Sequence, residues 1–378
     1  MAAGPRPLLR VCVVGAGSIS REFALHHFGP ATSTIVSAIV DLDADRAHQL
    51  AADVGSVQAG AAIENGGGTR YRAAAAETRG TPVSHSTSLT AATLAGCDVV
   101  YIGTTPGAHA LLAVEALEAG KHVLLEKPLA ATPADADIIV AAAEAALQRG
   151  QHVGMNIGMR WNPGLHELRR LAVTEGALGK LQSARLALHF RQWPREWQVQ
   201  PWCAGRAEGG PLREVGTHFF FGLMELFGHG CVKRVQATVT YPDGAAGVAA
   251  ESSAYGVLEL QNGLSISLSV RTDLGAAEAA EREARGARGD VYELEVVGET
   301  GALMLEDFSN LKRTAPAADA GYIVENGSYG RVECVQALVA RNGDDIGVGV
   351  TARQGRNAQR LLDAILSSEG QWLDVCYD

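Results

Sequence analysis

Cysteine is sparse in this sequence, and its spacing excludes the common metal-binding motifs. The six cysteines among 378 residues are scattered, and no two have the Cys-x-x-Cys spacing of a zinc knuckle. Scattered cysteines are typical of reduced intracellular thiols, so we expect a cytoplasmic protein. The sequence also contains no HExxH motif and no cluster of cysteine and histidine. We therefore expect no metal dependence.

Long apolar runs and excess basic charge are also absent. No run approaches the about 18 apolar residues that a membrane helix needs, and the N-terminus has no apolar segment typical of a signal peptide. The formal net charge is −10. Nucleic acids and anionic membranes both require a basic face, so we expect neither as a partner. The length is comfortable for two globular domains.

The first 156 residues alternate between short apolar runs and helical patterns. The predicted strands are residues 8–14, 34–40, 98–102, 122–125 and 151–156, with helices over 106–119 and 133–149. Residues 55–84 interrupt the alternation, and we interpret them as an inserted loop with a short helix over 71–78. Strand–helix alternation with short connections predicts an α/β domain with a doubly wound parallel sheet over residues 1–156.

Paired strands dominate the remainder of the chain. The predicted strands are residues 181–190, 231–240, 255–260, 264–270, 291–297 and 302–305. Asn262-Gly263 predicts a type I′ hairpin turn between two of them. We interpret residues 275–289 as a loop or frayed helix, and 353–366 as a final amphipathic helix that packs back. The sequence thus predicts an α+β domain over 157–378 with an open-faced, mostly antiparallel sheet.

A glycine turn and an acidic residue point to a dinucleotide. Gly15-Ala16-Gly17-Ser18-Ile19-Ser20 follows the first strand and matches G-x-G-x-x-G except at Ser20, which is small enough to replace the last glycine. Such a turn lets a pyrophosphate approach a helix N-terminus. Asp41 ends the second strand, where a carboxylate accepts the ribose hydroxyls of NAD and repels a 2′-phosphate. We expect NAD rather than NADP. A helix-capping role for Asp41 is the alternative, although Asp43 is better placed for it.

Two further segments end strands at the same predicted edge. Thr104-Thr105-Pro106 follows the strand 98–102, and His109 lies one turn later, either at the cofactor or on the helix surface. Glu126-Lys127-Pro128 follows the strand 122–125. A lysine that closes an apolar strand is rarely buried without a partner. Its ammonium group at this edge is suited to donate a proton to a hydroxyl or carbonyl oxygen beside a nicotinamide.

Together these residues resemble the glucose–fructose oxidoreductase, inositol dehydrogenase and MocA-type (Gfo/Idh/MocA) oxidoreductase family. The shared features are Gly15-Ala16-Gly17, Asp41, Thr105-Pro106 with His109, Glu126-Lys127-Pro128, Arg160-Trp161-Asn162-Pro163, Gly176–Gly179, Gly209-Gly210 through Gly216-Thr217-His218, and Gly298–Gly301. The resemblance implies a Rossmann domain, a C-terminal sheet that often mediates oligomers, and hydride transfer to or from sugars, polyols or related carbonyls. Glu214 replaces the family's usual aspartate, and Glu208 its usual third glycine.

The resemblance also implies roles for individual residues. The cofactor-binding residues would be Gly15, Gly17, Ser18, Ile19, Asp41, Thr104, Thr105, Pro106, His109, Glu126 and Lys127. His218 would take the hydroxyl proton, since histidine titrates at about pH 6.5, and Lys127 would stabilise negative charge on the same oxygen. Glu214 would orient the substrate or the histidine. The substrate-binding residues would be Arg160, Trp161, Trp202, Glu214 and His218. A core histidine is the alternative for His218.

Several readings of the function stay open at this point. One keeps the enzyme class and changes the substrate, to a trans-dihydrodiol or xylose-type dehydrogenase or a nucleotide-sugar ketoreductase. Another is a catalytically idle NAD-binding sensor on the same fold, and retention of both Lys127 and His218 argues against it. The open-faced sheet indicates a homodimer or homotetramer formed through its exposed face.

Overall fold

A computed structural model describes most of the chain. It describes residues 8–60, 62–64, 70–72, 82–244, 246–284, 286, 289–315, 320–325, 327, 330–339 and 349–377. The chain divides into two compact units, Met1–Asn156 with Arg331–Ala352, and Ile157–Gly330 with Arg353–Asp378. Residues 331–352 thus belong to the first unit, whereas the sequence pattern placed them in the second domain. The reason is that helix α9 (Arg331–Val339) packs on strands β7 and β8 of the first unit.

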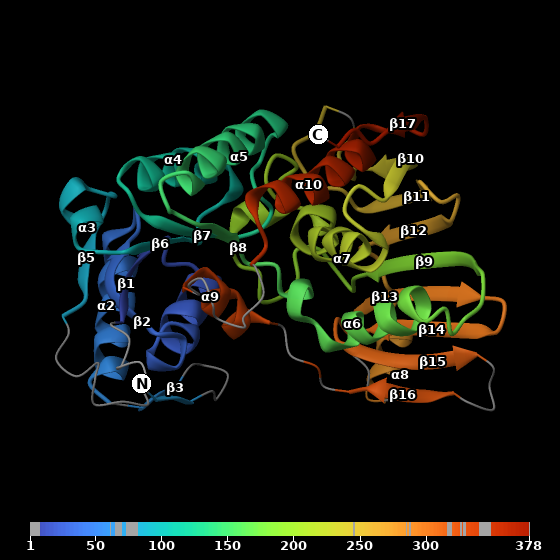
Figure 1. Cartoon of the computed structure of the whole chain (residues 1–378), viewed down its shortest axis with the longest axis horizontal. Coiled ribbons are helices and arrows are strands. Elements are labelled where there is room, and N and C mark those ends of the chain that lie inside the picture. The colour runs from blue at the N-terminus through green and yellow to red at the C-terminus, as the bar shows by residue number, and fades with distance from the viewer. Residues whose placement is uncertain are drawn as a thin grey trace. The chain divides into compact units, whose positions relative to one another are not determined.

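The first unit is the expected doubly wound parallel sheet. Its strand order among the described residues is β5-β2-β1-β6-β7-β8. These strands are β1 (Leu9–Val14), β2 (Thr34–Val40), β5 (Ser84–Ser86), β6 (Val99–Ile102), β7 (His122–Leu125) and β8 (Val153–Met155). The helices are α1 (Ser18–Glu22), α2 (Ala44–Gln58), α3 (Ala91–Ala95), α4 (His109–Glu118) and α5 (Pro133–Leu147). A π-helical segment, η1 (Phe23–His27), continues α1, and short turns η2 (Pro30–Thr32) and η4 (Pro106–Ala108) precede β2 and α4. Figure 1 shows α4 and α5 on one side of the sheet and α9 on the other.

The parallel strands of this sheet end in register. Val14 at the end of β1 is paired with Val40 of β2 and with Ile102 of β6, and Ile102 is paired with Leu125 of β7. The residues that follow these strands therefore leave the sheet at one carboxyl edge. In α/β sheets this edge is where ligands bind.

The predicted insertion differs from a simple loop. Helix α2 continues to Gln58 because Leu50, Val54 and Val57 keep its inner face buried. Two short strands, β3 (Ala62–Glu64) and β4 (Arg70–Arg72), pair antiparallel. The predicted helix over 71–78 is therefore wrong at residues 71 and 72. Residues 65–69 and 73–81 lie outside the described residues.

The second unit contains the expected mostly antiparallel sheet. Its order within the described residues is β16-β15-β14-β13-β9-β12-β11-β10-β17, and among its neighbours β12 and β9 run parallel. The strands are β9 (Leu181–His189), β10 (Val232–Thr240), β11 (Ser253–Leu260), β12 (Ser265–Arg271), β13 (Val291–Gly298), β14 (Gly301–Glu306), β15 (Asn310–Ala315), β16 (Gly321–Val324) and β17 (Trp372–Asp374). The sheet is wider than predicted, since β15, β16 and β17 carry weak apolar patterns.

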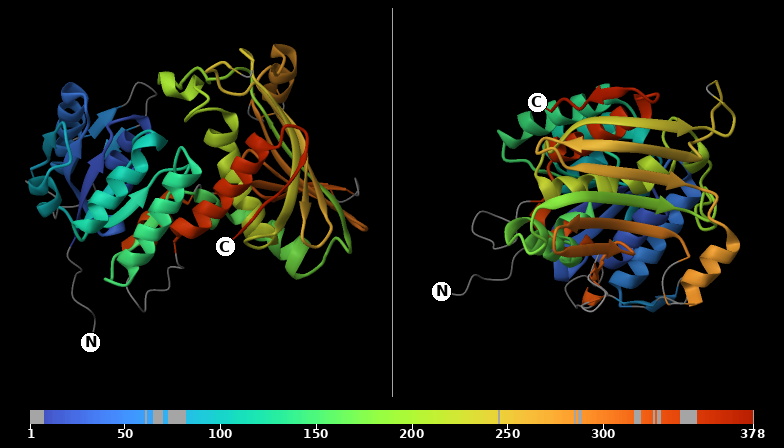
Figure 2. Two further views of the ribbon diagram at one scale, coloured as in Figure 1. Left: turned by 90° about the horizontal axis from the view of Figure 1, so that it is seen from above. Right: turned by 90° about the vertical axis from the view of Figure 1, so that its right-hand side faces the viewer.

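Helices cover one face of this sheet. The helical segments are η5 (Gly158–Trp161), α6 (Pro163–Arg169), η6 (Arg170–Thr174), η7 (Pro201–Ala204), η8 (Leu212–Gly216), α7 (Thr217–Phe227), α8 (Ala276–Ala284) and α10 (Ala352–Ser367). Figure 2 shows α7 and α10 on the same side of the sheet, while the opposite face is open. The alternation of β12 explains this, because Ile266, Leu268 and Val270 are buried, whereas Ser265 and Ser267 are exposed.

The Asn262-Gly263 hairpin forms, but its turn is not type I′. A type I′ turn needs positive φ at both central residues. Here Gly263 has φ +86° and Asn262 is not among the residues with positive φ. The Asn262 side chain instead accepts a hydrogen bond of 3.0 Å from the Leu264 N–H. Residues 276–284, expected as a loop or frayed helix, form helix α8.

Candidate functional site

The glycine turn after β1 is shaped by close contact with the end of β6. Gly15 has φ +91°, and a Cβ added there would lie 2.7 Å from the carbonyl oxygen of Gly103. Ser20 is fully buried, and its hydroxyl donates to the same carbonyl at 3.3 Å. It therefore fills the packing position of the missing third glycine. A Cβ on Gly17 would meet nothing within 4 Å, which leaves open space where the turn enters α1.

Asp41 holds the glycine turn through its side chain. Its Oδ2 accepts a hydrogen bond of 2.6 Å from the Ala16 N–H, and its Oδ1 accepts one of 2.8 Å from the Asp43 N–H. The Arg46 guanidinium lies 3.2 Å from Oδ1. Asp43 caps α2 by accepting from the Asp45 and Arg46 N–H groups. The capping role belongs to Asp43, as the sequence indicated.

Glu126 is buried behind the lysine that follows it. Its Oε1 accepts hydrogen bonds from the Tyr101 hydroxyl at 2.8 Å and from the Asn156 amide at 2.6 Å. Burial raises the pKa of the Glu126 carboxyl, and the neighbouring Lys127 opposes that shift. Lys127 itself is partly exposed. Glu126 thus anchors the segment that carries Lys127 just after the end of β7.

His109 is not a helix-surface histidine, because its side chain is fully buried. Its Nε2 lies 3.2 Å from the Thr104 carbonyl oxygen, and its Nδ1 lies 3.2 Å from those of Pro128 and Leu129. The ring therefore ties the loop after β6 to the loop after β7. In the structure His109 holds the backbone of these two loops in position. Thr104 and Thr105 are partly exposed, and Pro106 begins the turn η4.

In the second unit, one helical segment carries Glu214 and His218. Glu214 lies in η8, and His218 lies one turn later in α7. Glu251 accepts a hydrogen bond of 2.8 Å from the Leu212 N–H at the start of this segment, and only 1 % of it is exposed. Gly210, with φ +104°, leaves the space that the Glu251 carboxylate occupies. Burial raises the pKa of Glu251 to about 7.

Sequence reasoning missed two residues that contact this pair. The Gln198 amide donates to Glu214 Oε2 at 3.3 Å, and Glu214 is 8 % exposed. The Phe308 ring lies edge-on to the His218 ring, with centroids 6.0 Å apart. Asn162 donates to the Phe308 carbonyl at 2.8 Å. Gln198 and Phe308 have no motif around them, so no local signal could have identified them.

The other predicted substrate residues have structural contacts of their own. The Arg160 guanidinium pairs with buried Glu225 of α7 at 2.8 Å. Trp161 ends η5 and packs beside Gly330. Trp202 lies in η7, where its carbonyl accepts from the Gly205 N–H at 2.9 Å. Trp161 and Trp202 are both partly exposed. These contacts leave their substrate-binding roles as predictions.

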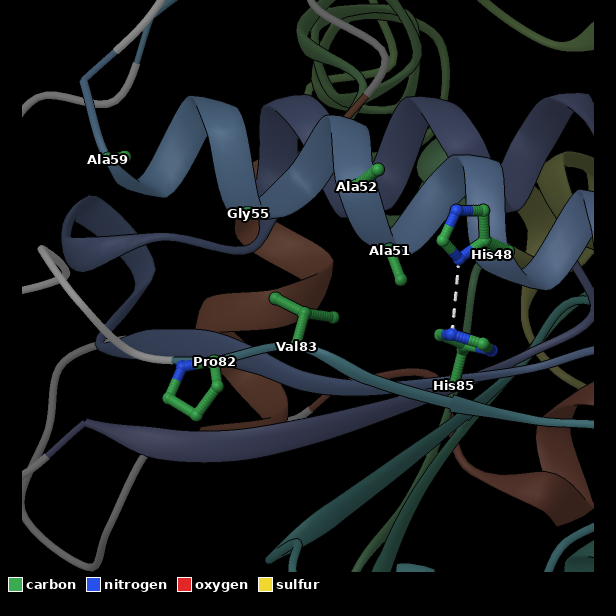
Figure 3. A pocket seen from close by; sticks show the side chains of 8 residues that line it. All are labelled: His48, Ala51, Ala52, Gly55, Ala59, Pro82, Val83 and His85. Carbon is green, nitrogen blue, oxygen red and sulfur yellow. Dashed lines mark hydrogen bonds between the residues drawn. The ribbon is translucent and has the colours of Figure 1, made fainter.

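A hollow of about 460 Å³ lies elsewhere in the first unit, between α2 and the chain entering β5 (Figure 3). Its lining includes Ala51, Val83 and two histidines, His48 and His85, whose ring nitrogens are 3.2 Å apart. None of the predicted site residues lines it.

The described residues lack two features that would indicate other kinds of function. They contain no group of three or more His, Cys, Asp or Glu side chains placed to hold a metal ion. Over the same ranges, no helix is both long enough and apolar enough to cross a membrane.

Two family models match the chain. Residues 9–154 match an oxidoreductase family with an NAD-binding Rossmann fold, and residues 166–304 match the Gfo/Idh/MocA C-terminal domain. The matches coincide with the sheet of the first unit and with most of the sheet of the second. The chain belongs to the Gfo/Idh/MocA oxidoreductase family, as its motifs indicated.

Individual relatives support the same assignment. The chain is 37 % identical over 124 residues to 1,5-anhydro-D-fructose reductase of Ensifer adhaerens, covering 32 % of this chain and 35 % of that protein. It is 31 % identical over 228 residues to D-apiose dehydrogenase of Paraburkholderia graminis, covering 58 % and 56 %. The matches thus span about half or less of these relatives. A levoglucosan dehydrogenase solved with NADH has the same fold, with a TM-score of 0.71, 19 % identity, and coverage of 98 % of this chain and 100 % of that one.

Proposed function

We propose that this protein is an NAD-dependent oxidoreductase that transfers a hydride between nicotinamide and a sugar, polyol or related cyclic alcohol or ketone. The observation that carries the proposal is the common edge at which β1, β2, β6 and β7 end. This edge presents the glycine turn, Asp41, the Thr104 loop and Lys127. The family match and the sugar-specific names of the relatives support the substrate class.

The residues at the edge fit a dinucleotide. The space beyond Gly17 and the absence of a side-chain cap on α1 leave room for a pyrophosphate at this turn. Asp41 follows the end of β2, the position from which a carboxylate would recognise the ribose hydroxyls in a fold of this kind. NAD, when bound, accepts the hydride that leaves the substrate carbon. We retain NAD as the preferred cofactor, with NADP less favoured.

The chemistry requires proton transfer at the substrate oxygen. We propose that His218 accepts the hydroxyl proton as the carbon loses its hydride, and that Lys127 donates a hydrogen bond to the same oxygen. Glu126 and His109 fix the segments on either side of Lys127. Glu214 lies one turn from His218 on the same helical segment, with Gln198 held against it. Glu214 is therefore suited to orient the substrate or the histidine.

The test is NADH formation with NAD and NADP offered separately. The substrates are a panel of aldoses, inositols, sugar acids, dihydrodiols and nucleotide sugars. Lys127→Ala is expected to lower kcat by at least 100-fold while NAD binding is retained, because removing an oxyanion-stabilising donor costs this much in other enzymes. Lys180→Ala, at an exposed lysine, is the matched control.

The outcomes separate the competing functions. Turnover of only dihydrodiols, xylose or nucleotide sugars would select the corresponding alternative dehydrogenase. Turnover with NADP alone would contradict the role of Asp41. Tight NAD binding without turnover across the whole panel, in both directions, would favour the sensor.

A further inference from the structure

Arg195 differs in its partners from three other arginines of the second unit. Arg160, Arg185 and Arg234 each pair with a glutamate. Within the described part of the chain, no carboxylate lies within ion-pair distance of Arg195. Its Nε donates to the Gln198 side-chain oxygen at 3.0 Å, and its Nη1 donates to the Tyr292 hydroxyl at 3.3 Å. Among the residues that the structure describes, only neutral groups therefore accept hydrogen bonds from this charged side chain, and an anion from outside the protein would be a favourable further partner.

The same guanidinium is framed by aromatic rings. Its carbon lies 5.2 Å from the ring centre of Trp193 and 4.5 Å from that of Trp197. Trp197 is 63 % exposed, which is unusual for so large an apolar side chain. These two ring contacts restrain the planar guanidinium, and its Nη2 group has no hydrogen-bond partner among the described residues. Arg195 is thus held in place while part of its donor set stays available.

Two short paths connect Arg195 to the proposed catalytic residues. In the first, Gln198 accepts from Arg195 and donates to Glu214 at 3.3 Å. In the second, Tyr292 contacts Arg195, and its ring packs on Phe308 with centroids 4.6 Å apart. Phe308 in turn lies against His218. Arg195 therefore lies within the neighbourhood of the helical segment that carries Glu214 and His218.

We propose that Arg195 and Trp197 form a subsite for a sugar that carries an oxyanion group. The guanidinium fork would bind the oxyanion through two parallel hydrogen bonds, and the exposed indole would pack against the sugar ring. A carboxylate and a phosphate share this recognition chemistry. The inference rests on the proposed function and narrows its substrate class to acidic sugars.

The test is calorimetric binding with the full chain saturated with NAD. The probes are matched sets that differ in the acidic group: D-glucose, D-glucuronate and D-glucose 6-phosphate, and D-galactose with D-galacturonate. At least one acidic sugar is expected to bind about 10- to 100-fold more tightly than its neutral partner, as expected for one charged hydrogen-bonding pair. The member of the glucose set that binds best distinguishes a carboxylate from a phosphate.

Variants assign the preference to this subsite. Arg195→Gln is expected to abolish the preference for acidic sugars. Trp197→Leu is expected to weaken the binding of acidic and neutral sugars alike. Arg191→Gln is the matched control, because Arg191 is half-exposed and already paired with Glu283. Equal affinities for acidic and neutral sugars would overturn the proposal, as would a preference that survives Arg195→Gln in a folded protein. Oxidation of neutral sugars alone would support the dehydrogenase function and contradict the acidic-sugar subsite. Binding of acidic sugars without hydride transfer would support the subsite and contradict the dehydrogenase function.

Discussion

The carboxylate of Asp41 accepts a hydrogen bond of 2.6 Å from the backbone N–H of Ala16. The residue expected to recognise the ribose of NAD thus also holds the turn expected to receive the pyrophosphate. Loss of this side chain would alter both parts of the cofactor site at once.

Cofactor preference should change when Asp41 is neutralised. In Asp41→Asn, a side-chain oxygen still supports Ala16, but the negative charge is lost and, among the described residues, Arg46 keeps only the Asp43 carboxylate as an ion-pair partner. The ratio of kcat/KM for NADP to that for NAD is expected to rise at least 10-fold, since a guanidinium near the ribose accommodates a 2′-phosphate. Adding Arg46→Ala should reverse the gain. An unchanged ratio in Asp41→Asn would contradict the assigned role.

The buried bond between Tyr101 and Glu126 should contribute to stability. Tyr101→Phe removes a donor from a carboxylate that is 4 % exposed, and such a loss costs roughly 1–3 kcal/mol in the free energy of unfolding. Tyr255→Phe, at a half-exposed tyrosine on the sheet, should change little. Urea unfolding of both variants measures the difference. Equal stabilities would show that the Tyr101 hydroxyl is dispensable.

Glu251 should give the protein a pH-dependent stability. Its carboxyl is buried, with the Leu212 N–H, Arg213, Arg206 and Tyr241 around it, and its pKa rises from 4.5 to about 7. Because the folded state binds the proton more tightly, stability falls as pH rises from about 4.5 to about 7 and then levels off. The shift corresponds to roughly 3 kcal/mol.

Glu251→Gln tests this directly. The amide retains an oxygen for the Leu212 N–H and carries no charge, so the variant should gain stability relative to the original protein as pH rises through that window. Thermal or urea unfolding at pH 5 and pH 8 measures the change, with exposed Glu118→Gln as the control. If the variant and the original protein differ in stability by the same amount at both pH values, the prediction is refuted.

The open face of the second sheet should mediate self-association. Tyr255, Val257 and Trp372 are 51, 36 and 40 % exposed, and Gln236 of β10 pairs with both Val257 and Trp372. These apolar side chains therefore lie close together on one face. Val257→Lys is expected to convert a dimer or tetramer to monomer in size-exclusion chromatography with light scattering. Leu42→Lys, at an exposed leucine of the first unit, should not. A monomeric original protein would exclude this interface.

Most of the fold could be predicted because its signals are local. Strand β2 was bounded correctly by the β-branched run 34–40, and Asp43 was recognised as a cap from its position before a helical pattern. Strand β15 was missed, since Lys312, Arg313 and Thr314 do not read as a strand without the neighbouring β14 that pairs with them. The sequence pattern does not predict helix α9 and places its residues in the second domain, because packing between distant segments has no signature in sequence.

The candidate site divides in the same way. Gly15, Asp41 and Lys127 follow strands directly, so their positions follow from topology. The helical segment of His218 is also contacted by residues that are distant from it in sequence, namely Gln198, Phe308 and Glu251. No motif near these residues identifies them.

The aligned ends of β1, β2, β6 and β7 have a consequence for how such a site can be altered. Each connection leaves the sheet from its own strand, and the strands are fixed by their pairing. The connections also contact one another, since the Asp41 carboxylate after β2 accepts from the Ala16 N–H after β1, and His109 joins the loops after β6 and β7. Adding or removing one residue in a single connection would shift its own functional group by about 3 Å and disturb the neighbouring connection as well. Pairs of connections, rather than single ones, are therefore the units in which this edge can be altered.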